Sequence, residues 1–390
     1  MTVRTIGIAL ASHPQNGGVF QYSLSMIDSL RNLPESKYRI EAIYHDELWE
    51  KHLPDTFIKR KYNNNVVMRL IGRILKIIKF HDLSDIAAFM TNPLVLAINR
   101  SQADIVIYPC GEEATYQASK PAISAIHDLM HRYEGHFLEY QNGEAERREH
   151  RYSKIAKYAK AILVDSQIGK QHVQESYSQL NADIFILPFT PPQYLTKLQH
   201  TDVRRKYQLP DRYFFYPAQF WEHKNHINLL NGIKILVDKK INIHMVFVGS
   251  VKDNYNNVLE HVTKLNLEDH VSILGYIPIE DMASLYRESV ALIFASLTGP
   301  TNIPPLEAML LNCPMAVSNV YAMHEQVGDA AILLDPQDPL SIANAMEQLW
   351  TNEQLRIILM QKGKEQIEKW NQFNFSLKVY NIIEKVESYL

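Results

Sequence analysis

The sequence lacks the features that mark several large classes of protein. Its two cysteines, Cys110 and Cys313, lie far apart without metal-ligand spacing, so we expect neither a disulfide framework nor a metal site built on cysteine. No run of about 18 apolar residues occurs, and a membrane-spanning helix is therefore not predicted. The net charge of -3 gives no sign of a nucleic-acid partner. Together these absences favour a protein of the reducing cytoplasm.

Neither half of the chain contains the G-x-G-x-x-G pattern, which argues against a nicotinamide-dependent dehydrogenase. The short apolar run 6–12 loosely imitates a signal peptide, but it leads into a glycine turn and an amphipathic segment, so we predict a first buried strand. The rest is ordinary for a globular protein. The 390 residues are 46% hydrophobic and 21% charged, and they suffice for about two domains.

Short apolar segments alternate with helical patterns in both halves of the chain. In the first half we predict strands at 4–12, 39–44, 104–108, 122–127, 161–165 and 183–187. In the second half we predict them at 213–217, 244–248, 271–274, 290–295, 315–318 and 331–333. This alternation predicts an α/β protein in which helices cover a parallel sheet in each half. The proline-rich joint 187–192 places the domain boundary near residue 195.

The segment 294–311 combines a buried strand, a short polar loop and a helix. Pro304 and Pro305 stand where the helix should begin, and Thr301 and Asn302 precede them as capping residues. Such a helix N-terminus offers free N–H groups and a partial positive charge, which suit a phosphate. Glu307 would supply an acceptor for a hydroxyl group beside it, as a nucleotide sugar requires. The alternative is a well-capped helix whose first-turn glutamate only complements the helix dipole.

Three further segments carry candidate ligand contacts. The loop after strand 213–217 contains Lys224, which would point an ammonium group toward the same edge of the sheet as the 301–305 turn and clamp a diphosphate with it. The alternative is a solvated lysine. Gly17 and Gly18 follow the first strand as a plain turn or a ligand loop. His127 ends another strand, either as a satisfied histidine or at a ligand.

The stretch 59–80 is basic and partly apolar. It carries seven positive charges with no acidic residue before Asp82: Lys59, Arg60, Lys61, Arg69, Arg73, Lys76 and Lys79. Isoleucine and leucine lie between them at near-helical spacing, which is typical of an amphipathic helix on an anionic membrane surface. The alternative is a helix with its apolar face in the protein core and its charges in solvent.

Taken together, these segments resemble the retaining glycosyltransferases of the GT-B fold, family 4 or glycosyl transferases group 1. The resemblance covers nearly the whole chain, is strongest from 213 to 335, and follows the family's order. It rests on Gly17-Gly18, Ile126-His127-Asp128, Phe220 to Asn225, Val246 to Gly249, Leu274 to Tyr276, and Gly299 to Glu307.

The resemblance implies two doubly wound, Rossmann-like domains that face each other across a cleft, with the last helix crossing back onto the first domain. Residues 1–195 with 374–390 would form the acceptor-side domain, and 196–373 the nucleotide-sugar domain. It also implies transfer of a hexose, with retained configuration, from a UDP-, GDP- or dTDP-linked sugar to a glycan or polyprenyl-linked acceptor. The process expected is bacterial surface polysaccharide synthesis, such as that of O-antigen, in the cytoplasm or peripherally at the membrane.

By position in the family pattern, Lys224 would contact the donor diphosphate and Glu307 the ribose hydroxyl groups. His127 would sit at the sugar with Asp128 beside it. The other donor-binding candidates are Gly17, Gly18, Gln219, Gly249, Tyr276 and the backbone of Pro300, Thr301, Asn302 and Ile303. No cofactor or metal is expected, because Lys224 and the helix terminus would replace the metal and no Asp-x-Asp motif is present.

Two residues depart from the family pattern. Gly299 stands where the family has a first glutamate, eight positions before Glu307, and Gln219 stands where it has an arginine. The change to Gln219 should cost donor affinity about tenfold or less, because a neutral hydrogen bond contributes roughly 1 kcal/mol less than a charged one. These departures keep two alternatives open: a nucleotide-sugar 2-epimerase of the same fold, and a catalytically silent partner that binds a glycan or a transferase.

Overall fold

A computed structural model describes residues 3–13, 17–63, 85, 88–89, 91–299 and 301–390. The chain divides into two compact units. Unit 1 comprises Met1–Leu129, Glu146–Phe189 and Gln372–Leu390, and unit 2 comprises Met130–Ala145 and Thr190–Asn371. Segments 130–145 and 190–195, which are predicted for the first domain, belong to unit 2.

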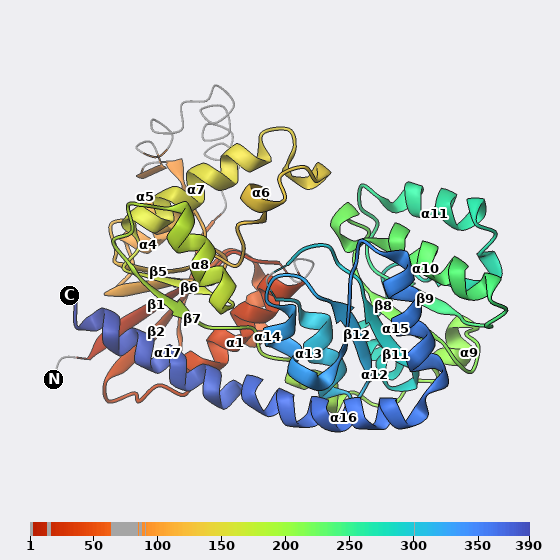
Figure 1. The fold of residues 1–390 in the computed structure, drawn as a ribbon. Helices are drawn as coiled ribbons and strands as arrows, with labels where there is room; N and C mark the ends of the chain where they lie inside the picture. Colours follow the sequence, from red (N-terminus) through yellow and green to blue (C-terminus); the bar gives the residue numbers. More distant parts are fainter. Residues whose placement is uncertain (1–2, 14–16, 64–84, 86–87, 90, 300) are drawn as a thin grey trace. The chain divides into compact units, whose positions relative to one another are not determined.

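Unit 1 is built on a seven-stranded sheet in the order β3-β2-β1-β4-β5-β6-β7, with every neighbouring pair parallel (Figure 1). Its strands are β1 (Arg4–Leu10), β2 (Tyr38–Tyr44), β3 (Ile58–Lys61), β4 (Ile105–Tyr108), β5 (Ala122–Ala125), β6 (Ala161–Val164) and β7 (Asp183–Ile186). The central strands are apolar and buried on both faces, as a parallel sheet between helices requires.

The helices of unit 1 cover this sheet. They are α1 (Gly18–Arg31), α4 (Pro93–Asn99), α5 (Ala114–Gln117), α7 (Glu144–Tyr158), α8 (Gln167–Ser176) and α17 (Gln372–Glu387). The last helix, α17, packs against α1, and the Gln372 side chain donates to the Ser25 carbonyl oxygen over 2.9 Å. The far end of α17 is held by Glu384, which accepts from Lys37 and from the Tyr38 hydroxyl. The C-terminal helix therefore belongs to the same unit as the first strand.

Unit 2 repeats the design with six parallel strands in the order β10-β9-β8-β11-β12-β13. Its strands are β8 (Phe214–Pro217), β9 (Met245–Val248), β10 (Val271–Ile273), β11 (Ala291–Phe294), β12 (Met315–Ser318) and β13 (Ile332–Leu334). Its helices are α6 (Met130–Tyr133), α9 (Val203–Tyr207), α10 (His226–Asp238), α11 (Tyr255–Lys264), α12 (Ile279–Glu288), α13 (Ile303–Leu310), α14 (Met323–Val327), α15 (Pro339–Thr351) and α16 (Glu353–Ile367).

The segment 59–61 differs from its prediction. Lys59, Arg60 and Lys61 lie in the edge strand β3, not in a basic helix. Each is paired with a carboxylate: Lys59 with Asp55, Arg60 with the buried Glu41, and Lys61 with Glu47. The other charges of the predicted helix, within 64–84, lie outside the described residues. None of the helices in the described part of the chain combines the length and apolarity needed to cross a bilayer.

Candidate active site

Each sheet reverses its strand order at one point, between β1 and β4 in unit 1 and between β8 and β11 in unit 2. In open α/β sheets, ligands bind at such switch points, beyond the carboxyl ends of the strands. In unit 2 the loop after β8 carries Lys224, and the loop after β11 leads into α13. The predicted diphosphate contacts therefore follow the two strands that flank the switch point.

The structure brings Lys224 and the N-terminus of α13 together. The Lys224 ammonium donates to Asn302 Oδ1 over 3.2 Å and to Ser296 Oγ over 3.5 Å. It also lies over the ring of Phe294, 5.4 Å from its centre. Asn225, which follows Lys224 in a left-handed conformation, fixes this loop by donating to the carbonyl oxygens of Ala295 and Pro336. An ammonium group and a helix N-terminus thus converge on one place.

The N-terminus of α13 is built differently from the prediction. Asn302 is the N-cap residue, but its side chain bonds to no first-turn amide. A capping side chain normally accepts from the N–H of the second or third helical residue, and in α13 these are Pro304 and Pro305, which have none. The Asn302 amide oxygen is therefore directed to Lys224 instead. The prolines also leave fewer free backbone donors than we predicted.

Further contacts fix the Asn302 loop. Gln326 is buried, accepts from the Asn302 N–H over 3.1 Å and donates to the Asn302 carbonyl oxygen over 2.6 Å. Thr301 and Ile303 flank Asn302, whereas Pro300 lies outside the described residues. The loop is thus anchored from a separate helix, α14, through a glutamine that the sequence analysis did not single out.

The structure explains why position 299 holds a glycine, which the sequence alone did not show. Its φ of 110° lies in the region that favours glycine, and a Cβ there would come within 2.7 Å of Asn302 Nδ2. Asn302, already bonded to Lys224, thus occupies the space that a side chain at position 299 would need.

Restoring the family glutamate should therefore weaken donor binding. We expect Gly299→Glu to displace Asn302 and to lower nucleotide-sugar affinity about 5- to 150-fold, since backbone strain of this kind costs roughly 1–3 kcal/mol. Calorimetric titration of the donor into both proteins measures the change. Equal or tighter binding by the variant would show that Asn302 and Gly299 do not form a matched pair.

Glu307 lies in the second turn of α13, half-buried, where the Tyr286 hydroxyl donates to its Oε2 over 2.6 Å. Burial raises the pKa of Glu307 to about 7, and the hydrogen bond from Tyr286 acts in the opposite direction. Burial, and then the charges of Glu307 and Tyr276, raise the pKa of Tyr194. Neither Tyr286 nor Tyr194 is among the residues predicted from the sequence. The only property that could have pointed to these two residues is that the hydroxyl group of a buried tyrosine needs a hydrogen-bond partner.

The other unit 2 candidates divide into two kinds. Tyr276 is 78% exposed, next to the left-handed Gly275, and its ring is open to a ligand. Gln219 accepts from Trp221 Nε1 over 2.8 Å, so its side-chain oxygen is already used within the loop. Gly249 fits the backbone beside it, because a Cβ would come within 2.1 Å of the Ala218 carbonyl oxygen. Close packing therefore explains why position 249 holds a glycine, whether or not a ligand binds there.

In unit 1, His127 is held through both ring nitrogens. Nδ1 lies 3.0 Å from Asp165 Oδ1, and Nε2 lies 2.7 Å from the Pro109 carbonyl oxygen. Burial lowers the pKa of His127, but Asp165 and the carbonyl oxygen outweigh it, so the net pKa is raised. An imidazolium with two acceptors is the form that this geometry favours. Asp165, at the carboxyl end of β6, was not among the predicted residues.

The remaining unit 1 candidates lie at the same edge of the sheet. Asp128 follows His127, and its Oδ1 is 3.7 Å from the guanidinium group of Arg148 on α7. Gly18 begins α1, and Gly17 precedes it with a φ of 58° and open space where a Cβ would stand. The first turn of α1 contains no acidic residue. Backbone can thus approach a ligand closely here, as the resemblance implies.

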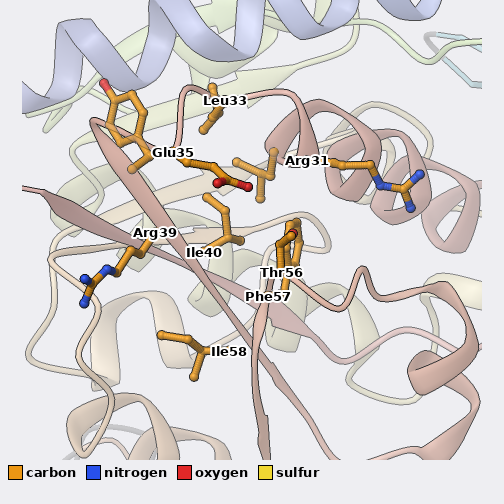
Figure 2. A pocket seen from close by; sticks show the side chains of 10 residues that line it. Arg31, Leu33, Glu35, Arg39, Ile40, Thr56, Phe57 and Ile58 are labelled. Carbon is orange, nitrogen blue, oxygen red and sulfur yellow. The ribbon is translucent and has the colours of Figure 1, made fainter.

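One pocket lies away from these residues, at the amino ends of β2 and β3 (Figure 2). It has a volume of about 490 Å³ and is lined by Leu30, Arg31, Leu33, Glu35, Tyr38, Arg39, Ile40, Thr56, Phe57 and Ile58. In Figure 2 the guanidinium groups of Arg31 and Arg39 point outward on opposite sides. Because parallel sheets bind ligands at their carboxyl ends, this pocket is not the candidate active site.

Comparisons with known proteins agree with this geometry. Residues 200–366 match the model of the family Glycosyl transferases group 1. The chain is 22% identical to the O-antigen chain mannosyltransferase RfbU of Salmonella typhimurium over 334 residues, which cover 85% of this chain and 87% of that protein. It is 27% identical to O-antigen chain mannosyltransferase B of Escherichia coli over 197 residues, 50% of each chain.

Two solved structures show the same fold along the whole chain. Sucrose-phosphate synthase from Thermosynechococcus elongatus aligns with a TM-score of 0.71 at 15% identity, covering 99% of this chain and 100% of that one. Anabaena HepE in complex with UDP-glucose aligns with a TM-score of 0.71 at 14% identity, covering 98% and 99%. The fold is GT-B, with two parallel α/β sheets. Residues 200–366 therefore resemble the glycosyl transferases group 1, and the chain as a whole shares the GT-B fold.

Proposed function

We propose that this protein is a glycosyltransferase that moves a hexose, with mannose as the first candidate, from a nucleotide-diphosphate donor to a glycan or lipid-linked acceptor and retains the anomeric configuration. The observation that carries the proposal is the convergence of Lys224 and Asn302 at the N-terminus of α13, with Glu307 one turn further on. Two relatives named as O-antigen chain mannosyltransferases support mannose and a surface polysaccharide as the product class. The structural relative HepE, solved with UDP-glucose, supports a nucleotide-sugar donor.

The proposed donor contacts follow from the charges in unit 2. The Lys224 ammonium and the helix N-terminus stabilise the diphosphate, the more so as its negative charge grows when the sugar leaves. The Lys224 partners Asn302 and Ser296 are neutral, so a phosphate oxygen can replace them without separating an ion pair at those contacts. Glu307 accepts from the ribose hydroxyl groups while Tyr286 holds its other side. Tyr276 stacks on the base through its exposed ring.

The proposed chemical step uses no nucleophile from the protein. The departing phosphate oxygen takes the acceptor proton as the acceptor oxygen attacks the same face of an oxocarbenium-like sugar. The protein then contributes orientation and charge stabilisation. His127, fixed as an imidazolium by Asp165 and Pro109, contributes a positive charge at the sugar in unit 1. No metal is needed for the diphosphate in this scheme, because Lys224 and the helix N-terminus offset its charge.

Two alternatives make different predictions. A nucleotide-sugar 2-epimerase would act without an acceptor, and a catalytically silent partner would bind without turnover. Contact with a membrane surface through residues 59–80 stays a separate hypothesis, and three of the charges that it counts are paired with carboxylates in β3.

A donor panel tests the proposal. We expect one of UDP-, GDP- or dTDP-linked mannose, glucose and N-acetylglucosamine to raise the melting temperature by several degrees, because a ligand that binds only the folded state stabilises it. With that donor, free nucleotide should accumulate faster when octyl α-D-mannopyranoside is present as an acceptor, and EDTA should leave the rate unchanged. Conversion of the donor to its epimer, or binding without turnover in the presence of glycan acceptors, would contradict the proposal.

A further inference from the structure

Residues 130–145 follow β5 of unit 1 in the sequence but belong to unit 2. The chain thus leaves unit 1 shortly after Asp128 and returns to it within α7. We call residues 130–145 the inserted segment. Ordering such a segment costs conformational entropy, so it needs contacts that hold it in place. Its contacts in unit 2 reach the loops of the proposed diphosphate site.

An apolar cluster anchors the inserted segment. Met130, Phe137 and Tyr140 are buried together, and Leu297 and Tyr321 pack against them. Leu297 lies in the loop between β11 and α13, and Tyr321 lies between β12 and α14. The inserted segment therefore packs against the loop that leads to the N-terminus of α13 and against the loop that leads to α14.

The inserted segment also braces the loop that carries Asn302. Its Glu134 accepts a hydrogen bond from the Tyr321 hydroxyl, just before α14. Helix α14 carries Gln326, which fixes the backbone of Asn302 through two hydrogen bonds. One side of the proposed diphosphate site is thus connected to the inserted segment through α14.

Lys224, on the other side of the site, lies in a one-turn helix that begins at Glu222. The two residues before Lys224 both contact the inserted segment. Glu222 Oε2 accepts from the Leu138 N–H over 3.4 Å, and His223 Nδ1 lies 2.8 Å from Glu139 Oε2. The side chains of His223 and Glu139 are only 12% and 14% exposed. Because little water reaches this pair, the contact between imidazole and carboxylate is stronger than on an open surface.

His223 connects Glu139 to the Lys224 ammonium group. The His223 carbonyl oxygen accepts from the Leu297 N–H over 2.8 Å and from the Ser296 hydroxyl over 3.3 Å. The same Ser296 hydroxyl lies 3.5 Å from Lys224 Nζ. Since His223 and Lys224 are neighbours in a single turn, a displaced His223 would carry Lys224 away from the N-terminus of α13.

We propose that Glu139 is a positioning residue for the donor, which holds the Lys224 ammonium group at the N-terminus of α13 by fixing His223. Glu139 itself does not touch the ligand. The inference rests on the proposed function for the identity of the ligand, whereas the positioning of Lys224 can be measured without one. A contact that only stabilised the fold would leave the Lys224 turn in place, and a direct ligand contact would act independently of Lys224.

The experiment compares Glu139→Ala and Glu139→Gln with Glu146→Ala, which removes an exposed glutamate of α7 as a matched control. Calorimetric titration measures the affinity for UDP, GDP or dTDP, whichever the donor panel selects. Initial rates give kcat and the donor KM. The titrations are repeated with Glu139→Ala combined with Lys224→Ala, because coupling between two residues appears as a departure from additive effects.

We expect Glu139→Ala to weaken nucleotide affinity at least about fivefold and to lower kcat about 10- to 100-fold, since a misplacement of about 1 Å can cost about 100-fold in rate. Glu139→Gln keeps an acceptor oxygen for His223 and should stay within about threefold of the wild type. In the Lys224→Ala background, Glu139→Ala should cost less than about twofold more. Glu146→Ala should keep wild-type values.

Amide hydrogen exchange of the ligand-free proteins measures the positioning itself. We expect Glu139→Ala to speed exchange at least about threefold in the peptide 220–225, which contains the Lys224 turn, and to leave the buried strand β9 unchanged. If Glu139→Ala does not fold, Glu139→Asp takes its place with the same expected results, because it draws the carboxylate back from His223 by one methylene group.

Three results would overturn the inference. One is a Glu139→Ala protein with the affinity and exchange of the control. Another is a set of losses in Glu139→Ala and Lys224→Ala that simply add, which would show that Glu139 acts independently of Lys224. The third is faster exchange throughout the protein, which would indicate a general structural role.

The exchange measurement separates this inference from the proposed function. If the wild type binds no nucleotide, the proposed function fails, and exchange in the peptide 220–225 then decides the inference by itself. Faster exchange confined to that peptide in Glu139→Ala supports the inference, and unchanged exchange refutes it.

Discussion

Lys224→Ala should lower kcat at least 100-fold and weaken donor binding. The Lys224 ammonium is the charged group at the proposed diphosphate site, and it is directed by Asn302 and Ser296 rather than by a carboxylate at those contacts. Removing one preorganised group that stabilises transition-state charge typically costs 10²–10³ in rate, by order of magnitude. Steady-state rates, together with calorimetric titration of the nucleotide, separate the effect on catalysis from the effect on binding.

The control for this variant is Lys234→Ala. Lys234 lies on α10 and pairs with Asp238 on the same helix, so its removal tests the loss of a lysine away from the α13 terminus. We expect Lys234→Ala to keep wild-type rates. Lys224→Arg should recover only part of the activity, because a planar guanidinium replaces a compact ammonium. Activity of Lys224→Ala within threefold of the wild type would show that the diphosphate lies elsewhere.

Glu307→Gln should weaken donor binding about 5- to 10-fold. The variant replaces a charged acceptor for the ribose hydroxyl groups by a neutral one, which contributes roughly 1 kcal/mol less. Since burial raises the pKa of Glu307 to about 7, the carboxylate form increases as the pH rises from 6 to 8. Donor KM in the wild type should therefore fall over this range, whereas in Glu307→Gln it should not depend on pH through this group. Donor KM values measured at several pH values test both statements.

The same substitution should make the protein more stable at high pH. An acid whose folded pKa exceeds its unfolded value binds its proton more tightly in the folded state, so folding stability is lost as the pH rises from about 4.5 to about 7. Glutamine removes this penalty, and the melting temperature of Glu307→Gln at pH 8 should exceed that of the wild type. A variant that keeps full donor affinity, or one that is destabilised at pH 8, would contradict the role given to Glu307.

Periodicity and chain order predicted most of the fold. All twelve predicted strands are present within two residues at each end, because parallel strands buried on both faces leave apolar runs between polar loops. The strand β3 escaped prediction, since its residues Ile58–Lys61 are mostly charged and carry no apolar alternation. Charge on an edge strand is a common protection against pairing with another chain.

Site residues were predicted only where they lie close to one another in the sequence. The Lys224 loop and the α13 terminus could be recognised because each is a single strand–loop–helix segment. Tyr286 and Asp165 could not, because they reach Glu307 and His127 from other elements, 21 and 38 positions away. The role of Asn302 was also missed, since it depends on two prolines that remove the usual capping bonds and on a lysine brought near by the sheet.

A crystal structure with the donor nucleotide bound tests the central claim most directly. We expect a diphosphate oxygen within hydrogen-bonding distance of Lys224 Nζ, at the N-terminus of α13, with the ribose hydroxyl groups against Glu307. A diphosphate bound away from α13, with Lys224 still on Asn302 and Ser296, would contradict the account.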